Sequence, residues 1–350
     1  MDEKPMPEIN TLLITIDYYP NVGGVARYLA SFVKKNNLEV LAGDPDFKVE
    51  TEAGVFRKTL MWNFFPKWLP LLFWGLIYSR HYKKIIISHI LPAGYVALLS
   101  KKPYVLILHG LDIINAGKSR WKKYWAEKIL RRAERIIVNS RATGELLSKV
   151  FGDFYKYQIQ YPAITPLPDP KKDFKNRHGL ENKKIILSLG RLVKRKGQEK
   201  IIRLMPKVLQ SVPNAVFVVA GGGPEKEDLE SLAKSFGISG QVMFLGKIKD
   251  SELPDIYNMC DIFIAPSLPS KEDWEGFGMV CLEAAYFGKP VIVTNVGGLP
   301  EAVEDGITGY VVQSDDELLE KILVLLKDEE SARKMGEAGR QRVKEKFLII

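Results

Sequence analysis

The sequence KEDWEGFGMVCLEAAYFGK, at Lys271–Lys289, holds two glutamates, Glu275 and Glu283, with seven residues between them. From Met279 onward, helix-forming and apolar residues predict a helix, which a glycine and then a proline end. The preceding segment DIFIAPS, residues 261–267, is typical of a buried strand. Strand, loop and helix in this order form the repeating unit of a parallel α/β sheet, so this stretch predicts an α/β fold.

The loop between this strand and helix is a candidate binding site. Its glycines leave backbone N–H groups bare at the start of a helix, where the helix dipole favours an anion such as a diphosphate. We expect the anion to bind at Gly276, Phe277, Gly278 and Met279. A carboxylate beside an anion is better placed to accept hydrogen bonds from sugar or ribose hydroxyls, which is the role we expect for Glu275 and Glu283. The alternative is a solvated helix with two ordinary glutamates.

Strand and helix patterns alternate along the whole chain. In the first half, strands are expected at 11–18, 38–42, 55–60, 84–90, 104–109 and 135–139, and helices at 25–35, 66–82, 92–100 and 120–132. In the second half, strands are expected at 184–190, 215–220, 242–245, 261–265, 290–294 and 309–312, and helices at 199–210, 225–236, 252–259 and twice at the end of the chain. Such alternation predicts two parallel sheets, with a ligand bound at the carboxyl ends of the strands.

Four prolines at 162, 166, 168 and 170 form the densest proline cluster and predict the hinge. We therefore expect an N-terminal α/β domain at 1–165, a Pro-rich linker at 166–178 and a C-terminal α/β domain at 179–350.

Composition is that of a globular protein, with 350 residues of which 27% are charged and 46% hydrophobic. Only two cysteines occur, Cys260 and Cys281, so neither a disulfide framework nor a cysteine metal site is expected. The N-terminus, MDEKPMPEIN, lacks the apolar run of a signal peptide, which predicts a cytoplasmic location.

The segment SLGRLVKRKG, Ser188–Gly197, follows an expected strand and carries four cations. Arg191 and Lys196 are the candidates to hold a diphosphate and to neutralise charge on a departing nucleotide. Lys194 and Arg195 are alternatives for the second role, and a solvated basic loop is the simpler interpretation.

Taken together and in order, G-R-L…K-G and E-G-F-G…E resemble the signature of the family 4 retaining GT-B glycosyltransferases, over nearly the whole chain. The resemblance implies two Rossmann-like α/β domains facing a central cleft, the N-terminal one on the acceptor side and the C-terminal one binding the nucleotide sugar. It places Arg191 and Lys196 on the donor phosphates. It also implies that the loop at Gly23 and Gly24 faces the diphosphate and acceptor. By the same resemblance His109 lies near the reactive carbon of the sugar, although a lone histidine at a strand end is more often structural.

The expected reaction moves a hexose of mannose or glucose type from a GDP- or UDP-linked sugar to a hydroxyl of a lipid or lipid-linked glycan. No carboxylate of the first domain is an evident covalent nucleophile, so we expect the departing phosphate to assist the incoming hydroxyl. The acids Asp44 and Asp46 enclose a proline, which indicates a turn, and neither a metal nor another cofactor is expected. The alternatives are a nucleotide-sugar epimerase of the same fold and a non-catalytic nucleotide-sugar binding protein.

Charge is concentrated in the first half of the chain. Residues 1–165 hold 24 Lys and Arg against 14 Asp and Glu, a net charge of +10, whereas the remainder holds 27 against 28, a net of −1. Between residues 60 and 135 there are 14 basic and three acidic residues, interleaved with aromatic ones at 61–82 and 120–132. This pattern favours contact with an anionic membrane surface over nucleic acid. We therefore expect peripheral binding to the cytoplasmic membrane face, unless the aromatic residues are ordinary core.

Overall fold

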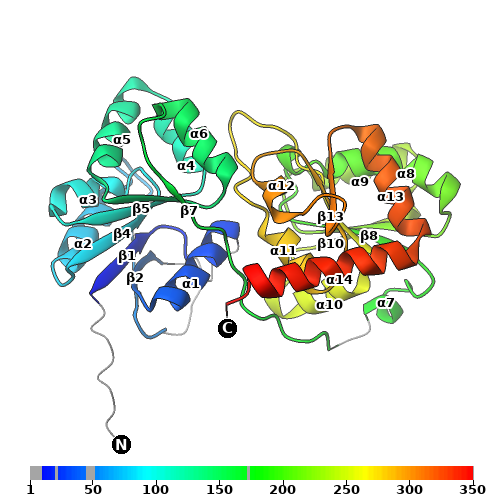
Figure 1. Cartoon of the computed structure of the whole chain (residues 1–350). Helices are drawn as coiled ribbons and strands as arrows, with labels where there is room; N and C mark the ends of the chain where they lie inside the picture. Colours follow the sequence, from blue (N-terminus) through cyan, green and yellow to red (C-terminus); the bar gives the residue numbers. More distant parts are fainter. Residues whose placement is uncertain (1–9, 20–22, 45–51, 172–173, 350) are drawn as a thin grey trace, which may run out of the picture. The chain divides into compact units, whose positions relative to one another are not determined.

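The computed structural model describes residues 10–19, 23–44, 52–171 and 174–349. The chain divides into two compact units, Met1–Ala163 and Ile164–Ile350. Each unit is built on one parallel sheet with helices on both of its faces, as the alternation of strands and helices predicts (Figure 1).

The sheet of the first unit has seven strands in the order β3-β2-β1-β4-β5-β6-β7. Their bounds are β1 Thr11–Thr15, β2 Glu39–Gly43, β3 Val55–Lys58, β4 Lys84–Ser88, β5 Tyr104–Leu108, β6 Arg135–Val138 and β7 Gln158–Ile159. The direction in which strands are added reverses between β1 and β4, and in a sheet of this kind a ligand binds beyond the carboxyl ends of those two strands.

Six helices cover this sheet: α1 Gly24–Asn36, α2 Leu69–Ser79, α3 Gly94–Ser100, α4 Leu111–Gly117, α5 Arg120–Arg132 and α6 Arg141–Phe151. Strand β1 contributes to both faces, because successive side chains of a strand point to opposite sides. Its Leu12 and Ile14 pack with the core under α2 to α6, whereas Leu13 packs with α1. All three are fully buried, each worth about 1.5–3 kcal/mol relative to an exposed position.

The sheet of the second unit has six strands in the order β10-β9-β8-β11-β12-β13. Their bounds are β8 Lys184–Leu189, β9 Ala215–Ala220, β10 Val242–Gly246, β11 Ile262–Ala265, β12 Val291–Thr294 and β13 Gly309–Val312. The α-helices are α7 Phe174–Arg177, α8 Gln198–Ser211, α9 Lys226–Ser235, α10 Leu253–Met259, α11 Met279–Tyr286, α12 Leu299–Ala302, α13 Asp315–Lys327 and α14 Glu329–Lys346. Three short 3₁₀ turns, η1 Lys194–Lys196, η2 Ser239–Gln241 and η3 Asp250–Glu252, lie in the loops. Here the strand order reverses between β8 and β11.

Three elements of the first unit differ from the sequence-based expectation. Helices α4 and α6 and the two-residue strand β7 were not predicted. Helix α6 does carry a start signal, since the Ser140 side chain accepts a hydrogen bond from the backbone N–H of Thr143 as an N-cap.

The proline-rich segment expected as a linker groups with the second unit. Ile164 pairs with Leu348 in an isolated bridge, and Phe174 lies in the core beside α10. The apolar residues between and after the prolines, which a proline count ignores, attach this segment to the second sheet.

Candidate active site

A cluster of charged side chains in the second unit lies at the carboxyl ends of β8 and β11, the two strands that flank the reversal of strand order. The loop after β8 carries Arg191, Arg195 and Lys196, and the loop after β11 carries Asp273 and Glu275. Side chains far apart in the sequence therefore meet at one edge of the sheet, where parallel α/β sheets bind ligands.

Glu275 is the centre of this cluster. Its Oε2 accepts hydrogen bonds from Lys196 Nζ at 2.8 Å, from Ser267 Oγ at 3.1 Å and from the Arg195 guanidinium. Burial by itself would raise the pKa of this carboxyl group, but Lys196 and Arg195 outweigh burial and lower the pKa to about 2. Glu275 is therefore charged at neutral pH and holds the two cations Arg195 and Lys196.

Arg191 and Arg195 differ in exposure. The Arg195 side chain is 9% exposed, and its Nε donates to Asp273 Oδ2 at 2.7 Å in addition to the bond with Glu275. The Arg191 side chain is 68% exposed and reaches Asp273 Oδ2 only at 3.7 Å. Arg195 is thus committed to internal ion pairs, whereas Arg191 is available to a ligand.

Close backbone contacts hold these loops together. A Cβ atom at Gly197 would lie 1.9 Å from the carbonyl oxygen of Pro266, and one at Gly297 would lie 2.2 Å from the carbonyl oxygen of Glu275. The backbone N–H of Gly298 donates to the same Glu275 oxygen at 2.9 Å. The loop after β12, with the sequence GGLPE at Gly297–Glu301, therefore contacts the backbone of Glu275 directly and holds it in place.

Helix α11 begins at Met279, with Gly278 as its N-cap at φ 89°. The side chains of Phe277 and Met279 are buried in the core, so only their backbone groups can face a ligand. Glu283 lies in the second turn of the helix and is 2% exposed, and its Oε2 accepts the Tyr257 hydroxyl at 2.6 Å. The hydroxyl-binding role expected for Glu283 stays a prediction.

The first unit places His109 directly after β5, and the ring is 5% exposed. Its Nε2 lies 3.0 Å from Ser88 Oγ, and Asp112 Oδ1 accepts the backbone N–H groups of His109 and Gly110 at 2.9 Å each. Burial lowers the pKa of His109 to about 3, and the neighbouring His89 adds to this shift. His109 is therefore an uncharged ring at neutral pH.

Other expected features of the first unit are described in part. Gly23 is the N-cap of α1 and Gly24 its first residue, and both are exposed. The turn that precedes them, residues 20–22, lies outside the described residues, as does Asp46. Asp44 accepts a hydrogen bond from Thr59 Oγ1 at 3.0 Å.

Sequence reasoning missed two polar residues near His109, Asp17 and His89. Asp17 follows β1 and His89 follows β4, so both stand at the reversal of strand order in the first sheet. His89 Nε2 and Asp17 Oδ2 are 3.3 Å apart. Their positions in the sequence could have indicated them, because each is a polar residue that comes directly or almost directly after an apolar strand.

Comparisons with known proteins place the chain in a family. Residues 22–164 match the family model for Glycosyltransferase Family 4, and residues 170–342 match the one for Glycosyl transferases group 1. A GDP-mannose-dependent alpha-(1-6)-phosphatidylinositol monomannoside mannosyltransferase of Mycolicibacterium smegmatis is 30% identical, over 94% of this chain and 92% of the relative. This chain belongs to glycosyltransferase family 4. The resemblance seen in the sequence is confirmed, and the protein is a glycosyltransferase of the hexosyltransferase class.

Other proteins similar to this chain have names that specify different substrates. The N-acetyl-alpha-D-glucosaminyl L-malate synthase of Bacillus anthracis is 34% identical over 75% of this family 4 chain and 70% of its own. The crystal structure of Anabaena HepE in complex with UDP and glucose superposes with a TM-score of 0.78 at 21% identity, covering 96% of this chain and 95% of HepE. That likeness confirms the GT-B fold, as predicted.

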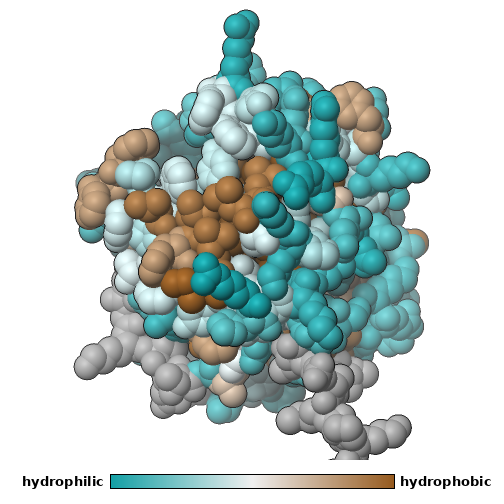
Figure 2. Space-filling model, turned by 90° about the vertical axis from the view of Figure 1, so that its left-hand side faces the viewer, coloured by the Kyte–Doolittle hydropathy of each residue, from teal (hydrophilic) through white to brown (hydrophobic). Residues whose placement is uncertain are grey.

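Exposed aromatic side chains occur on segment 62–73 and on α5 of the first unit. Figure 2, which looks at the side that carries α2, α3 and α5, shows an apolar brown area bordered by hydrophilic teal residues. We call the exposed aromatic side chains of 62–73 and α5 the aromatic face: Trp62, Phe64, Phe65, Phe73, Trp121 and Tyr124. Phe65 is the most exposed at 87%. The alternative that the aromatic residues are ordinary core does not hold for these six side chains.

Cations lie beside some of these aromatic rings. Lys128 Nζ lies 4.5 Å from the ring centroid of Tyr124, and Lys58 Nζ lies 4.8 Å from that of Trp74, which contacts Phe73 of the aromatic face. Among the described residues, none of the helices is both apolar enough and long enough to cross a bilayer. The same residues contain no group of three or more His, Cys, Asp or Glu side chains placed to hold a metal ion.

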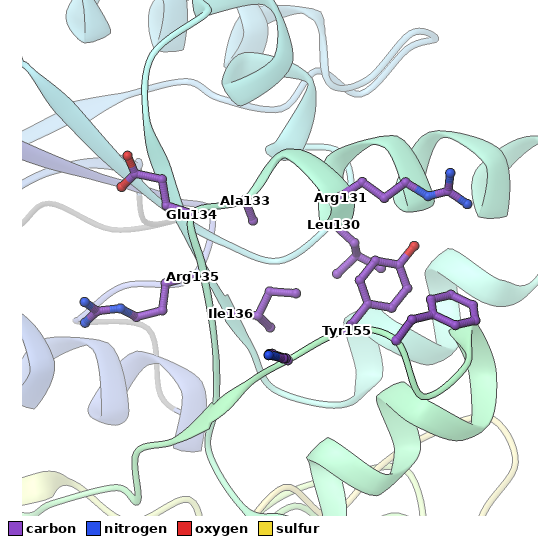
Figure 3. Close-up of a pocket in the computed structure, with 9 residues that line it drawn as sticks. Leu130, Arg131, Ala133, Glu134, Arg135, Ile136 and Tyr155 are labelled. Carbon is purple, nitrogen blue, oxygen red and sulfur yellow. The ribbon is translucent and has the colours of Figure 1, made fainter.

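A cavity of about 620 Å³ lies elsewhere on the first unit. Figure 3 shows that its wall comes from the end of α5, the start of β6 and the segment before β7, with the Glu134 and Arg135 side chains pointing away from Tyr155. The cavity is lined by Leu130, Arg131, Ala133, Glu134, Arg135, Ile136, Phe154, Tyr155 and Lys156. It borders the amino end of β6, whereas His109 and Asp17 follow the carboxyl ends of strands, so it is separate from the candidate site.

Proposed function

We propose that this enzyme transfers a hexose, mannose in the first instance, from a GDP-linked donor to a hydroxyl of a lipid acceptor with retention of anomeric configuration. The ion cluster around Glu275 is the observation that carries this proposal. It contains one exposed and one partly exposed cation, Arg191 and Lys196, which pair with Asp273 and Glu275 of the loop that leads into α11. The start of a helix favours a diphosphate, and exposed cations can bind one, which supports the proposal.

In the proposed reaction the bond between the sugar C1 and the phosphate oxygen breaks, and a bond forms between C1 and the acceptor oxygen on the same face. The proton of the acceptor hydroxyl passes to the departing phosphate. Arg191, Lys196 and the backbone at 276–279 stabilise the negative charge on the leaving nucleotide. Glu275 holds Lys196 in place and, with Glu283, accepts sugar or ribose hydroxyls, while His109 contacts the sugar.

Two findings support a lipid acceptor. The first is the aromatic face, since exposed aromatic rings with neighbouring cations suit the interface of an anionic membrane. The second is the similarity to a mannosyltransferase whose name specifies GDP-mannose and a phosphatidylinositol mannoside. The bacterial N-acetylglucosaminyl malate synthase supports a second candidate, transfer to a small soluble acceptor.

A matrix of donors and acceptors tests the proposal. The donors are GDP-mannose, UDP-glucose and UDP-N-acetylglucosamine, and the acceptors are phosphatidylinositol mannoside vesicles and L-malate, each assayed with and without a chelator. We expect glycolipid formation from GDP-mannose, equal in the presence of chelator. Malate glycoside as the product would transfer support to the small-acceptor candidate, and nucleotide-sugar isomerisation without transfer would support the epimerase. Binding of a nucleotide sugar with no turnover would indicate a binding protein.

A further inference from the structure

Four polar side chains meet at the carboxyl ends of β1, β4 and β5, and the proposed chemistry uses only one of them. They are Asp17, Ser88, His89 and His109. Ser88 Oγ lies 3.0 Å from His109 Nε2 and 3.2 Å from His89 Nδ1, and the two imidazole rings are 5.4 Å apart between centroids. A continuous chain of contacts therefore runs from Asp17 through His89 and Ser88 to His109.

The neighbours of His89 fix its protonation. Its Nε2 faces the Asp17 carboxylate at 3.3 Å, and its Nδ1 faces the carbonyl oxygen of Ser88 at 2.8 Å. A carboxylate and a carbonyl oxygen can only accept hydrogen bonds, so both ring nitrogens of His89 must carry hydrogen. Burial opposes the charged ring, but the bond to Asp17 and the charges of Asp112 and Asp17 raise the pKa of His89 above its ordinary value.

This arrangement decides which nitrogen of His109 carries hydrogen. Because His89 Nδ1 carries hydrogen, it cannot accept the hydroxyl hydrogen of buried Ser88, and His109 Nε2 is the remaining hydrogen-bond partner of Ser88 Oγ among the described residues. The Ser88 hydroxyl therefore donates to His109 Nε2. That nitrogen is then an acceptor, and because the His109 ring is neutral, its single hydrogen lies on Nδ1.

His109 Nδ1 is buried and has no hydrogen-bond partner among the described residues, and the same is true of Asp112 Oδ2. Buried polar atoms without partners are rare and costly, and a ligand is one of the reasons for them. In the tautomer derived above, His109 Nδ1 is a hydrogen-bond donor and Asp112 Oδ2 is an acceptor. The turn at 109–112 therefore presents a donor and an acceptor from two residues that are each 5% exposed.

We propose that Asp17, His89 and Ser88 are positioning residues that set the Nδ1–H tautomer of His109, and that this N–H donates to an oxygen of the transferred sugar. The contact with the sugar rests on the proposed function, whereas the tautomer is a property of the unliganded chain. His89 has a left-handed backbone at φ 81°, which is costly for a residue other than glycine and accompanies a constrained functional geometry.

Histidine ¹⁵N NMR tests the tautomer directly, because the chain has only four histidines. In protein labelled with ¹⁵N-histidine, variants at His81 and His178 assign the two remaining rings. We expect a neutral Nδ1–H ring for His109 and a doubly protonated ring for His89 at pH 7. In Ser88→Ala the Nε2–H form of His109 should become populated, whereas Ser88→Thr, which keeps a hydroxyl, should preserve the Nδ1–H form.

Two further variants probe the rest of the chain of contacts. Asp17→Asn should leave His89 neutral at pH 7, and His89→Asn, a residue that tolerates φ above zero, should release the tautomer of His109 without backbone strain. Thermal unfolding and binding of GDP show whether each variant is folded. Turnover in Ser88→Ala should fall by roughly tenfold or more, as for loss of a preorganised donor, and recover in Ser88→Thr.

A His109 that carries hydrogen on Nε2 in the wild type would overturn the inference, as would an Nδ1–H form that persists unchanged in folded Ser88→Ala and Asp17→Asn. If the wild type shows the expected tautomers but transfers no sugar from any donor, the proposed function fails and the role of Asp17, His89 and Ser88 in setting the tautomer stands.

Discussion

Arg191 and Lys196 bind the donor phosphates in the proposed reaction, so their removal should slow transfer. Arg191→Ala and Lys196→Ala should each lose at least ~1.5 kcal/mol of transition-state stabilisation, a tenfold or larger fall in kcat/KM, because each removes a charge-assisted hydrogen bond. Steady-state kinetics with GDP-mannose measure this effect. Lys194→Ala removes an exposed cation of the same loop and is the matched control, expected to be near neutral. Wild-type kinetics for both Arg191→Ala and Lys196→Ala would contradict the assignment.

Glu275 should make stability depend on pH in the acid range. Its pKa is lowered from 4.5 to about 2, so the carboxylate stabilises the fold above pH 4.5 and loses that contribution as the pH falls toward 2. The shift corresponds to a contribution on the order of 3 kcal/mol at neutral pH. Urea unfolding should therefore show Glu275→Gln clearly less stable than wild type at pH 7, with the gap narrowing below pH 4.

The matched control is Glu272→Gln, which changes an exposed glutamate of the same loop that has no ion pair among the described residues. Its difference from wild type should stay small at every pH. A gap for Glu275→Gln that is constant from pH 7 to pH 3 would show that the ion cluster does not depend on this charge.

At the level of single residues, the sequence predicts which loops form the candidate site better than it predicts which side chains of those loops bind a ligand. The sequence favours Arg191 and Lys196 among the four cations of SLGRLVKRKG, but only packing shows that the Arg195 side chain is buried and the Arg191 side chain exposed. Asp17 and His89 follow different strands, and their contact depends on the pairing of β1 with β4, which no local pattern contains. A motif predicts a site well when its residues are consecutive and poorly when tertiary pairing brings them together.

At the level of elements, the phosphate loop depends on the glycine at 197. Gly197 has φ +69°, and an added Cβ would meet the backbone of Pro266, whereas Gly179 has φ +64° with nothing within 4 Å. Gly179→Ala should therefore cost only the left-handed strain, about 1–2 kcal/mol. Gly197→Ala should cost clearly more and should also weaken GDP binding, because the loop that carries Lys196 must move. Urea unfolding and calorimetry measure the two effects, and equal costs for the two variants would contradict the close contact.

The main elements could be predicted because their patterns are strong. Helix α5 and strand β13 have the bounds expected from sequence, since apolar periodicity and turn residues mark both ends. Helix α4 has only seven residues, which is too short for a periodic apolar pattern to predict it. Helix α6 does begin with a local signal in the sequence, the N-cap serine at 140. Proline content predicts a linker because proline interrupts helices and strands. It does not predict the packing of Ile164 and Phe174 on the second unit, because that packing depends on residues distant in sequence.

At the level of the whole molecule, the aromatic face should bring the enzyme to an anionic membrane. Changing Arg120, Lys122 and Lys123 to serine should weaken vesicle binding by about 1 kcal/mol per cation, roughly a hundredfold in total. Phe65→Ser should weaken binding further by removing an exposed ring. Sedimentation with phosphatidylserine vesicles measures this, and wild-type binding should decrease steeply with salt because the attraction is screened beyond about 8–10 Å.

A matched control carries the same change in charge on the second unit, with serine at the exposed positions Lys207, Lys234 and Lys327. It should bind vesicles almost as well as wild type. Equal losses in the two triple variants would mean that net charge alone governs binding, and no binding by wild type would contradict a membrane role for the aromatic face.

The anomeric configuration of the product tests the proposed transfer most directly. GDP-α-mannose and a phosphatidylinositol mannoside acceptor are incubated with the enzyme, and the one-bond C1–H1 coupling of the new linkage is read by NMR. We expect an α-mannosyl glycolipid and one GDP released for each bond formed. A β-linked product, or GDP and free mannose without any glycolipid, would contradict the proposed retaining transfer to a lipid hydroxyl.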